Sequence, residues 1–278
     1  MSGETNEIEY RVCVAKRLAA YIRAYLGALT AWQWKLPTAC AEWQVRDVVS
    51  HLIGGAERQA ESMERGRGGD YNPPAGFVTQ EPVELSATNA KRDIDRSNQL
   101  EGHFLESFDI SYGLLHHQFD QYCGASWDTL AWHARRGAMT AAAYVELRIQ
   151  ELAIHDYDIR SAFRSDPSLD PESVPVLLDM TPRWLGMCFR PSDALPRPVV
   201  YRFDVGSEIY RMTVTGDQFV MELGDTLQAD LSLSASRENY LLFTYGRLSA
   251  ADGIASGKLV VLGDLGYLDR FEAWFKGL

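Results

Sequence analysis

The chain has 278 residues and a formal net charge of −11, and 46% of its residues are apolar. The negative charge argues against nucleic acid or an anionic membrane surface as a main partner, and no apolar run approaches the roughly 20 residues of a membrane-spanning helix. The four cysteines are scattered, with neither a C-x-x-C pair nor a preceding signal peptide. This usage favours free thiols in a reducing cytoplasm.

The first two thirds of the sequence carry helical periodicity. Four segments show it: 8–29, 45–65, 86–122 and 140–163. A segment rich in Gly, Pro and Asp at 66–76 predicts an exposed loop between the second and third helices. Four helices with connections of this kind indicate a bundle, and a further helix is expected over 172–189.

Beyond Arg197 the pattern changes to period two. The segments VVYRFDV, EIYRMTVTG, QFVMEL and ADLSLSAS alternate apolar and polar residues, which predicts a small antiparallel sheet. Ser236 is placed to cap a helix over ENYLLFTYG, KLVVLGD reads as another strand, and LGYLDRFEAWF as a closing helix. We therefore expect an α+β fold, with a helical domain at 1–192 and a small α/β domain at 193–278.

Polar side chains recur on one face of the apolar helix expected over 140–163. Glu151 and His155 lie one turn apart, close enough to hold one metal ion between them. Two ligands are too few, and His51 on the second helix is the best candidate for a third. The alternative is an exposed Glu151–His155 pair and a core histidine at 51, because E-x-x-x-H is common in helices.

Three segments, in this order, resemble the mycothiol-dependent maleylpyruvate isomerase family of the DinB-like superfamily. They are EWQVRDVVSHLIGG at 42–55, GAMTAAAYVELRIQELAIHDYDI at 137–159, and YGRLSAADG at 245–253 with KLVVLGD. The resemblance implies a DinB-like metal-binding four-helix bundle followed by an α/β domain similar to sterol carrier proteins. By the family's motifs the metal ligands would be His51, Glu151 and His155. Two imidazoles and one carboxylate suggest Zn2+, with Ni2+ or Fe2+ as alternatives.

The resemblance also implies a chemistry. Mycothiol, a low-molecular-weight thiol of actinobacteria, would be held as a thiolate, add to an activated cis double bond of a small electrophile, and leave after rotation about the single bond. The same thiolate could instead be transferred to the electrophile, or exchanged on a thiol-conjugated intermediate of antibiotic biosynthesis, as for lincosamides. A non-catalytic small-ligand-binding protein is the alternative from another class. We expect a monomer or homodimer.

Two arginines are candidate catalytic residues. Arg247 in YGRLSAADG matches an arginine that the family uses in catalysis, and its guanidinium could clamp a carboxylate or a developing enolate. The alternative is that Arg247 closes the end of the preceding helix. Arg148 shares the ligand face, where it would bind a substrate carboxylate or pair with Glu151. Asp47 and Asp158 are placed either to orient an imidazole or to be solvated, and the remaining histidines are expected to be surface or structural: His103, His116, His117 and His133.

Overall fold

The computed structural model describes residues 2–40, 42–226 and 228–275 and divides into two compact units, Met1–Val176 and Leu177–Leu278. Each unit has helices, and the second also carries a five-stranded sheet, so the α+β fold class is confirmed. The domain division expected between residues 192 and 193 stays a prediction. Within the described ranges, no helix combines the length and the apolar character that crossing a membrane requires.

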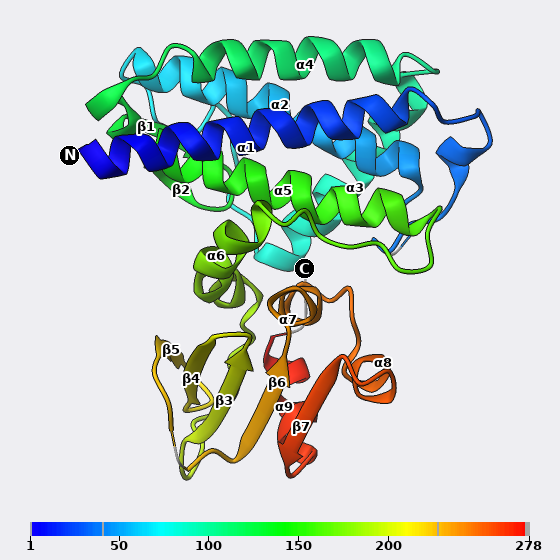
Figure 1. Cartoon of the computed structure of the whole chain (residues 1–278). Helices are drawn as coiled ribbons and strands as arrows, with labels where there is room; N and C mark the ends of the chain where they lie inside the picture. The colour runs from blue at the N-terminus through cyan, green and yellow to red at the C-terminus, as the bar shows by residue number, and fades with distance from the viewer. Residues whose placement is uncertain (1, 41, 227, 276–278) are drawn as a thin grey trace. The chain divides into compact units, whose positions relative to one another are not determined.

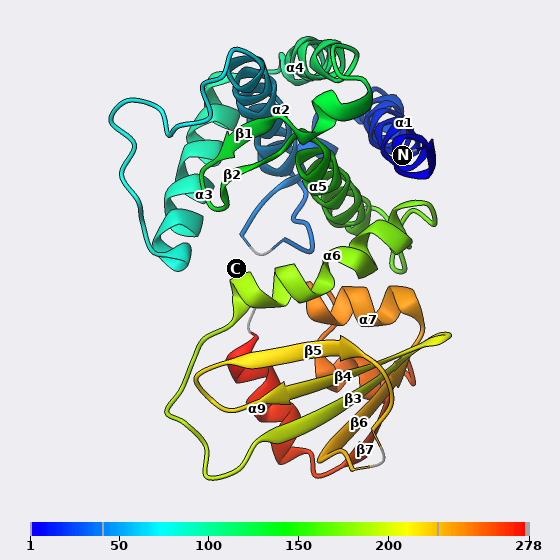
Figure 2. The ribbon, with the colours of Figure 1, turned by 90° about the vertical axis from the view of Figure 1, so that its left-hand side faces the viewer.

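The N-terminal unit is built on a ring of packed helices (Figures 1 and 2). Its members are α1 (Ser2–Leu26), α2 (Val45–Arg67), α4 (Phe104–Phe119) and α5 (Ala141–Ser161). α1 and α2 each pack against both α4 and α5, which closes a four-helix bundle around one apolar core. Its fully buried side chains include Leu18, Ile22, Leu26, Val48, Leu52, Leu115, Val145 and Leu152.

The expected helix over 86–122 is wrong, because two helices occupy this segment. α3 (Pro82–Gln99) packs against α2 outside the ring, and α4 starts at Phe104. The break lies at Glu101 and Gly102, whose φ angles are 44° and 98°. A glycine adopts this left-handed conformation without strain and ends helices for that reason. Gly102 was therefore a stop signal within the polar stretch.

The start of α2 is fixed by a capping box. Asp47 accepts a hydrogen bond from the backbone N–H of Gln44 at 3.0 Å, and its other oxygen accepts one from the Ser97 hydroxyl of α3. Asp47 therefore caps α2 and ties α3 to it, which is a structural role. Because His51 follows one turn later, this cap also sets the position of that imidazole.

A hairpin that the sequence analysis missed joins α4 to α5. It consists of β1 (Leu130–His133) and β2 (Gly137–Thr140), which pair antiparallel. A short 3-10 helix, η2 (Gly124–Asp128), directly precedes the hairpin, and another, η1 (Gln33–Lys35), lies between α1 and α2. β1 packs against α2. Directly after the hairpin, the Thr140 side chain accepts a hydrogen bond from the Ala143 N–H at 3.2 Å and caps α5.

The second unit is organised around one sheet with the strand order β5-β4-β3-β6-β7. Its strands are β3 (Val199–Val205), β4 (Glu208–Val214), β5 (Phe219–Leu223), β6 (Leu231–Ala235) and β7 (Leu259–Gly263). β3 and β6 pair in parallel, so the expected antiparallel sheet is wrong for this pair. β4 and β5 occupy one side of β3 as an antiparallel meander, and β6 fills the free side, running in the same direction as β5.

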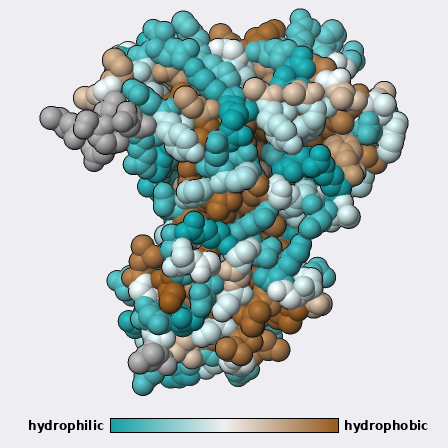
Figure 3. All heavy atoms as spheres, viewed as in Figure 1, coloured by the Kyte–Doolittle hydropathy of each residue, from teal (hydrophilic) through white to brown (hydrophobic). Residues whose placement is uncertain are grey.

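Aromatic packing covers one face of this sheet. The helices in this part of the chain are α6 (Ser173–Cys188), α7 (Arg237–Thr244), α8 (Ala250–Ala255) and α9 (Gly266–Trp274). The Phe271 ring of α9 contacts Tyr201 and Phe203 of β3 and Phe243 of α7 at centroid distances of 5.4–5.6 Å. The Ser236 hydroxyl caps α7 as expected, accepting from the Asn239 N–H at 3.1 Å. Exposed apolar side chains remain on the edge strands: Val220, Val260 and Leu262. Figure 3 shows brown, apolar patches on the surface of this unit.

Close packing of α2 on β1 makes Gly66 sensitive to substitution. A Cβ added there would lie 2.2 Å from the backbone oxygen of Leu130, so the hairpin would have to move. We expect Gly66→Ala to lower the free energy of unfolding, measured in urea, by about 1–3 kcal/mol. Gly113→Ala on the exposed face of α4 is the control, because nothing lies within 4 Å of the added atom. It should be neutral or stabilising by up to about 1 kcal/mol; equal values for both variants would contradict this packing.

Candidate metal centre

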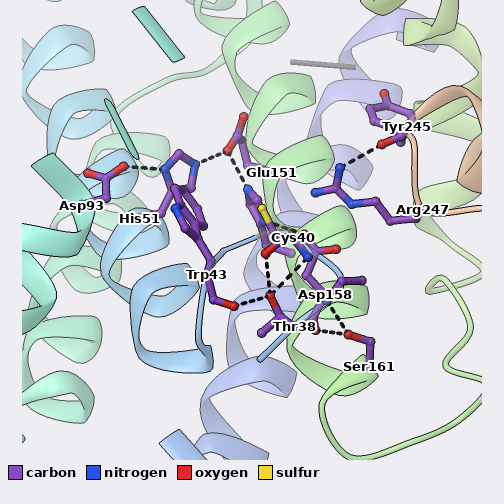
Figure 4. Close-up of polar contacts among 12 residues, drawn as sticks. Thr38, Cys40, Trp43, His51, Asp93, Glu151, Asp158, Ser161, Tyr245 and Arg247 are labelled. Carbon is purple, nitrogen blue, oxygen red and sulfur yellow. Dashed lines mark hydrogen bonds and ion pairs between the residues drawn. The ribbon is translucent and has the colours of Figure 1, made fainter. Parts of the chain in front are cut away.

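The packing of α2 against α5 brings three predicted ligands together (Figure 4). His51 Nε2 of α2 lies 2.8 Å from Glu151 Oε2 of α5, and His155 Nε2 lies 3.7 Å from the same oxygen. One donor atom from each of the three residues lies within 4.8 Å of the others. Ligands bonded at about 2.0–2.2 Å to one tetrahedral ion are about 3.4 Å apart, so the trio has the spacing of a mononuclear site.

Each imidazole of the trio is hydrogen-bonded through its Nδ1 atom to a buried carboxylate. His51 Nδ1 donates to Asp93 Oδ2 at 2.7 Å, and His155 Nδ1 donates to Asp158 Oδ2 at 2.9 Å. Both aspartates are 0% exposed, and an ionised carboxylate can only accept a hydrogen bond. The Nδ1 atoms therefore carry the protons, and both Nε2 atoms are turned toward Glu151. This is the arrangement that fixes imidazole ligands in metal sites.

The charges of the trio are strongly coupled. Burial opposes the charged form of His51, but hydrogen bonds to Asp93 and Glu151 outweigh it and raise the His51 pKa. Burial also opposes ionisation of Glu151, yet the hydrogen bond from His51 and the nearby His155 and Arg148 hold its pKa well below the usual range. His51 Nε2 and Glu151 Oε2 therefore meet at hydrogen-bonding distance, at the position where an ion would bind.

Asp93 is the residue of this group that the sequence analysis missed. It lies on α3, in the stretch where the helix boundaries were wrong. Burial opposes its charge, but the bonds to His51 and Arg92 lower the pKa of Asp93 to about 2, so it is ionised at neutral pH. Asp158 does contact an imidazole, as one of its two expected roles requires, whereas Asp47 caps α2.

One side of the trio is covered by the loop that precedes α2. The Trp43 ring lies over both imidazoles, with centroid distances of 5.1 Å to His51 and 6.1 Å to His155. The loop is tied to the end of α5 by the Ala39 N–H, which donates to Ser161 Oγ at 2.8 Å. The trio still reaches solvent, since the side chains of His51, His155 and Glu151 are 19%, 12% and 29% exposed. A small molecule can therefore approach it.

Cys40 belongs to the same loop and lies beside the second imidazole. A donor atom of Cys40, one of His155 and one of Asp158 lie within 4.8 Å of one another. Because Asp158 bonds to Nδ1 of His155, this group forms on the opposite side of the ring from Glu151. The other cysteines do not share this position: Cys13 and Cys123 are exposed, and Cys188 is buried in α6.

Comparison with known proteins decides the family. The sequence model described as "Mycothiol maleylpyruvate isomerase N-terminal domain" matches residues 15–160, just over half of the chain. The chain belongs to this family. The matched range contains His51, Glu151 and His155, and it confirms the resemblance of the first two motifs.

Solved structures show that most of the chain shares the fold of members of this family. A crystal structure of the mycothiol-dependent maleylpyruvate isomerase matches with a TM-score of 0.63 at 13% identity, covering 87% of this chain and 90% of that chain. A mutant of that isomerase matches with a TM-score of 0.64 at 12% identity, covering 91% and 92%. At such identities the matches show the fold alone. No curated protein matches the sequence.

A sterol carrier protein 2-like structure from Aedes aegypti also matches. It has 17% identity and covers 37% of this chain and 95% of that chain, at a TM-score of 0.28. A score this low supports no functional argument. The shared fold of the C-terminal unit therefore depends on the isomerase structures, which cover nearly the whole chain.

Arg148 lies one turn before Glu151 but forms no ion pair with it among the described residues. Its Nε donates to Gln59 Oε1 at 2.8 Å, and the side chain is 4% exposed. No direct contact therefore supports the alternative in which Arg148 pairs with Glu151. The neighbouring His133 ring packs edge-on against Tyr144 at 5.5 Å and interacts electrostatically with Glu151, nearer to the trio than expected for a surface residue.

Arg247 lies in a family motif whose other residues have structural roles. Gly246 ends α7 with a φ of 72°, and Ser249 caps α8 by accepting from the Asp252 N–H at 3.0 Å. The Arg247 Nη1 donates to the Tyr245 backbone oxygen at 2.8 Å (Figure 4). This contact fits the helix-end role considered for Arg247, and its catalytic role stays a prediction.

The buried hydrogen bond to His51 predicts a role for Asp93 in metal affinity. Asp93→Asn keeps the side-chain shape but removes the charge that orients the ring, so we expect metal affinity to fall about 10–100-fold. Competition with a chromophoric chelator measures this. Asp95→Asn on the same helix is the matched control and should bind as the wild type does. Unchanged affinity in Asp93→Asn would remove Asp93 from the site.

Proposed function

We propose that this family member is a metal-dependent enzyme that activates mycothiol as a thiolate for isomerisation of a small electrophile. The observation that carries the proposal is the convergence of two carboxylate-backed imidazoles and one carboxylate at a point open to solvent. Membership in the family supports thiol-dependent isomerisation at a coarse level. The three named ligands, the metal and the substrate belong to the proposal.

The donor set suits a divalent cation. His51 and His155 present Nε2, Glu151 presents an oxygen, and no further donor is needed for an open catalytic site with three protein ligands. Zn2+ is the ion we propose, while Ni2+ and Fe2+ accept the same donors. When bound, such an ion supplies a positive charge that stabilises the deprotonated form of a thiol at neutral pH.

The chain's own residues restrict what can reach this point. Trp43 covers the imidazoles on the loop side, so substrates must approach from the exposed side of Glu151. Asp93 and Asp158 keep both rings in one tautomer while the substrates exchange. Arg148, buried one turn from Glu151, is proposed to orient the electrophile by its guanidinium, and Arg247 is proposed as a second catalytic arginine.

The thiol is proposed to come from solution. Among the cysteines, Cys40 is the one beside the trio, and it lies next to Nδ1 of His155 rather than next to Glu151. A small thiol in the cytoplasm, where we place the protein, therefore has to supply the nucleophile. Maleylpyruvate, named for the related isomerases, is the first electrophile to test.

Isomerisation and sulfur transfer share the thiolate but differ in mass balance. An isomerase returns each thiol after addition, rotation and elimination, whereas a transferase or a thiol-exchange enzyme consumes one thiol per product. Counting free thiol before and after turnover therefore separates these activities. A non-catalytic ligand-binding protein would need neither thiol nor metal.

The proposed ligands make metal content predictable. The purified protein should hold about one divalent ion per chain, and His51→Ala or His155→Ala should lower the affinity by at least about 100-fold, since each removes one of three protein ligands. Metal analysis after dialysis against a chelator buffer measures this. His103→Ala, whose ring is exposed on the surface, should retain the ion. Full occupancy in either site variant would refute the ligand assignment.

Thiol activation can be tested without knowing the electrophile. In protein loaded with Co2+, mycothiol should produce a sulfur-to-cobalt absorption band in the near ultraviolet, because the thiol ligates as thiolate. Cys40→Ser should show the same band, since the thiol comes from solution. A spectrum insensitive to mycothiol, or a band that needs Cys40 and no added thiol, would contradict the proposal.

A further inference from the structure

Two consecutive glycines in α2 lie one turn beyond His51, and the guanidinium groups of Arg58, Arg148 and Arg96 lie against them. A Cβ added to Gly55 would be 3.0 Å from Nη1 and 3.1 Å from Nη2 of Arg148, and one added to Gly54 would be 2.8 Å from Nη1 of Arg58. Arg148 reaches this place from α5, and Arg58 folds back along α2 toward its N-terminus, as helical side chains do. Arg96, which pairs with Glu57, lies 3.6 Å from the atom added to Gly54. The glycines thus make room for Arg58 and Arg148 at adjacent positions.

Arg148 is held rigidly and leaves donors unused. It is 4% exposed, and its Nε is fixed by Gln59, which is 0% exposed and is itself held by the backbone oxygen of Tyr144 at 3.0 Å. The Nη1 atom is buried and has no hydrogen-bond partner, and the same holds for the hydroxyl of nearby Tyr112, whose pKa burial raises to about 12 against the opposing effect of Arg148. Leaving a charged donor buried and unpaired costs free energy, so the Nη1 atom points to a ligand that accepts its hydrogen bond.

Among the described residues Arg58 forms no ion pair either, unlike the arginines of the neighbouring helix, and its side chain is exposed to solvent. Arg92 pairs with Asp93 and Arg96 pairs with Glu57, whereas no ion pair neutralises Arg58 or Arg148 among the described residues. Desolvation by the surrounding protein and repulsion from Arg92 and Arg148 lower the pKa of Arg58 to about 10, and the attraction of Asp93 offsets part of this shift. Arg58 therefore remains charged at neutral pH, and a bound anion would relieve the repulsion.

We propose that Arg58 and Arg148 form a carboxylate-binding subsite over Gly54 and Gly55, one turn from His51. The claim that the subsite holds a carboxylate of the electrophile rests on the proposed function. The claim that it binds a carboxylate does not. Two guanidinium groups from different helices offer forked donors that match the two oxygens of a carboxylate. The nearby Glu151 interacts electrostatically with Arg148 and reduces the net positive charge, which favours a monoanionic carboxylate over a phosphate dianion.

The test uses metal-free protein and two small probes, crotonate and its neutral analogue crotonamide. Ligand-observed NMR titrations at constant, low ionic strength should show crotonate binding at least about tenfold more tightly than crotonamide. Arg58→Gln and Arg148→Gln should each weaken crotonate binding by about tenfold or more. Arg65→Gln, which removes the same charge from α2 at a residue paired with Asp70, should bind crotonate within about twofold of the wild type.

A fourth variant protects the test against loss of folding in Arg148→Gln. Gly55→Ala keeps every charge and improves helix propensity, but its methyl group must displace the Arg148 guanidinium that Gln59 holds, so crotonate affinity should fall. Equal binding of the two probes, or wild-type affinity in both Arg58→Gln and Gly55→Ala, would overturn the subsite. Because neither metal nor thiol is present, a failure of thiol activation leaves these outcomes unchanged, and the two proposals fail separately.

Discussion

The site depends on one constraint, which is that the carboxylates placed inside the bundle must be paired. Asp93, His51, Glu151, His155 and Asp158 form a continuous chain of hydrogen bonds and ion pairs across α3, α2 and α5. Breaking a buried pair leaves an uncompensated charge and costs about 3–5 kcal/mol. The chain of pairs therefore fixes how α2, α3 and α5 pack, and the packing in turn fixes the geometry of the three donor atoms.

Much of this site could be predicted from local sequence, because the ligands lie on helices with clear periodicity. Glu151 and His155 are related by one helical turn, and His51 lies beside the apolar stripe of α2, so two helix predictions and one packing step suffice to bring them together. The N-cap of α7 at Ser236 was similarly local. Each of these inferences needs only side chains a few residues apart.

The parts that could not be predicted depend on contacts between distant segments. Asp93 faces His51 only because α3 ends at Gln99 and packs on α2, and the expected continuous helix over 86–122 obscured that register. The unpartnered Arg58 and Arg148 are likewise invisible in sequence, since arginines normally pair with whatever carboxylate is near. The parallel pairing of β3 with β6 depends on which side of β3 is free, which no single strand pattern encodes.

Net charge connects the metal centre to the arginines beside it. Asp93, Glu151 and Asp158 place three carboxylates at the centre, Arg92 pairs with Asp93, and a divalent ion with neutral imidazoles would offset the charge of the other two. A thiolate would then make the centre negative, so an anionic electrophile would be repelled by the site that activates its nucleophile. Arg58 and Arg148 lie one turn from the ligands and, within the part of the chain that the structure describes, form no ion pair with a carboxylate. On this argument their lack of partners is a requirement of the chemistry, because arginines already neutralised by protein carboxylates could not offset the repulsion.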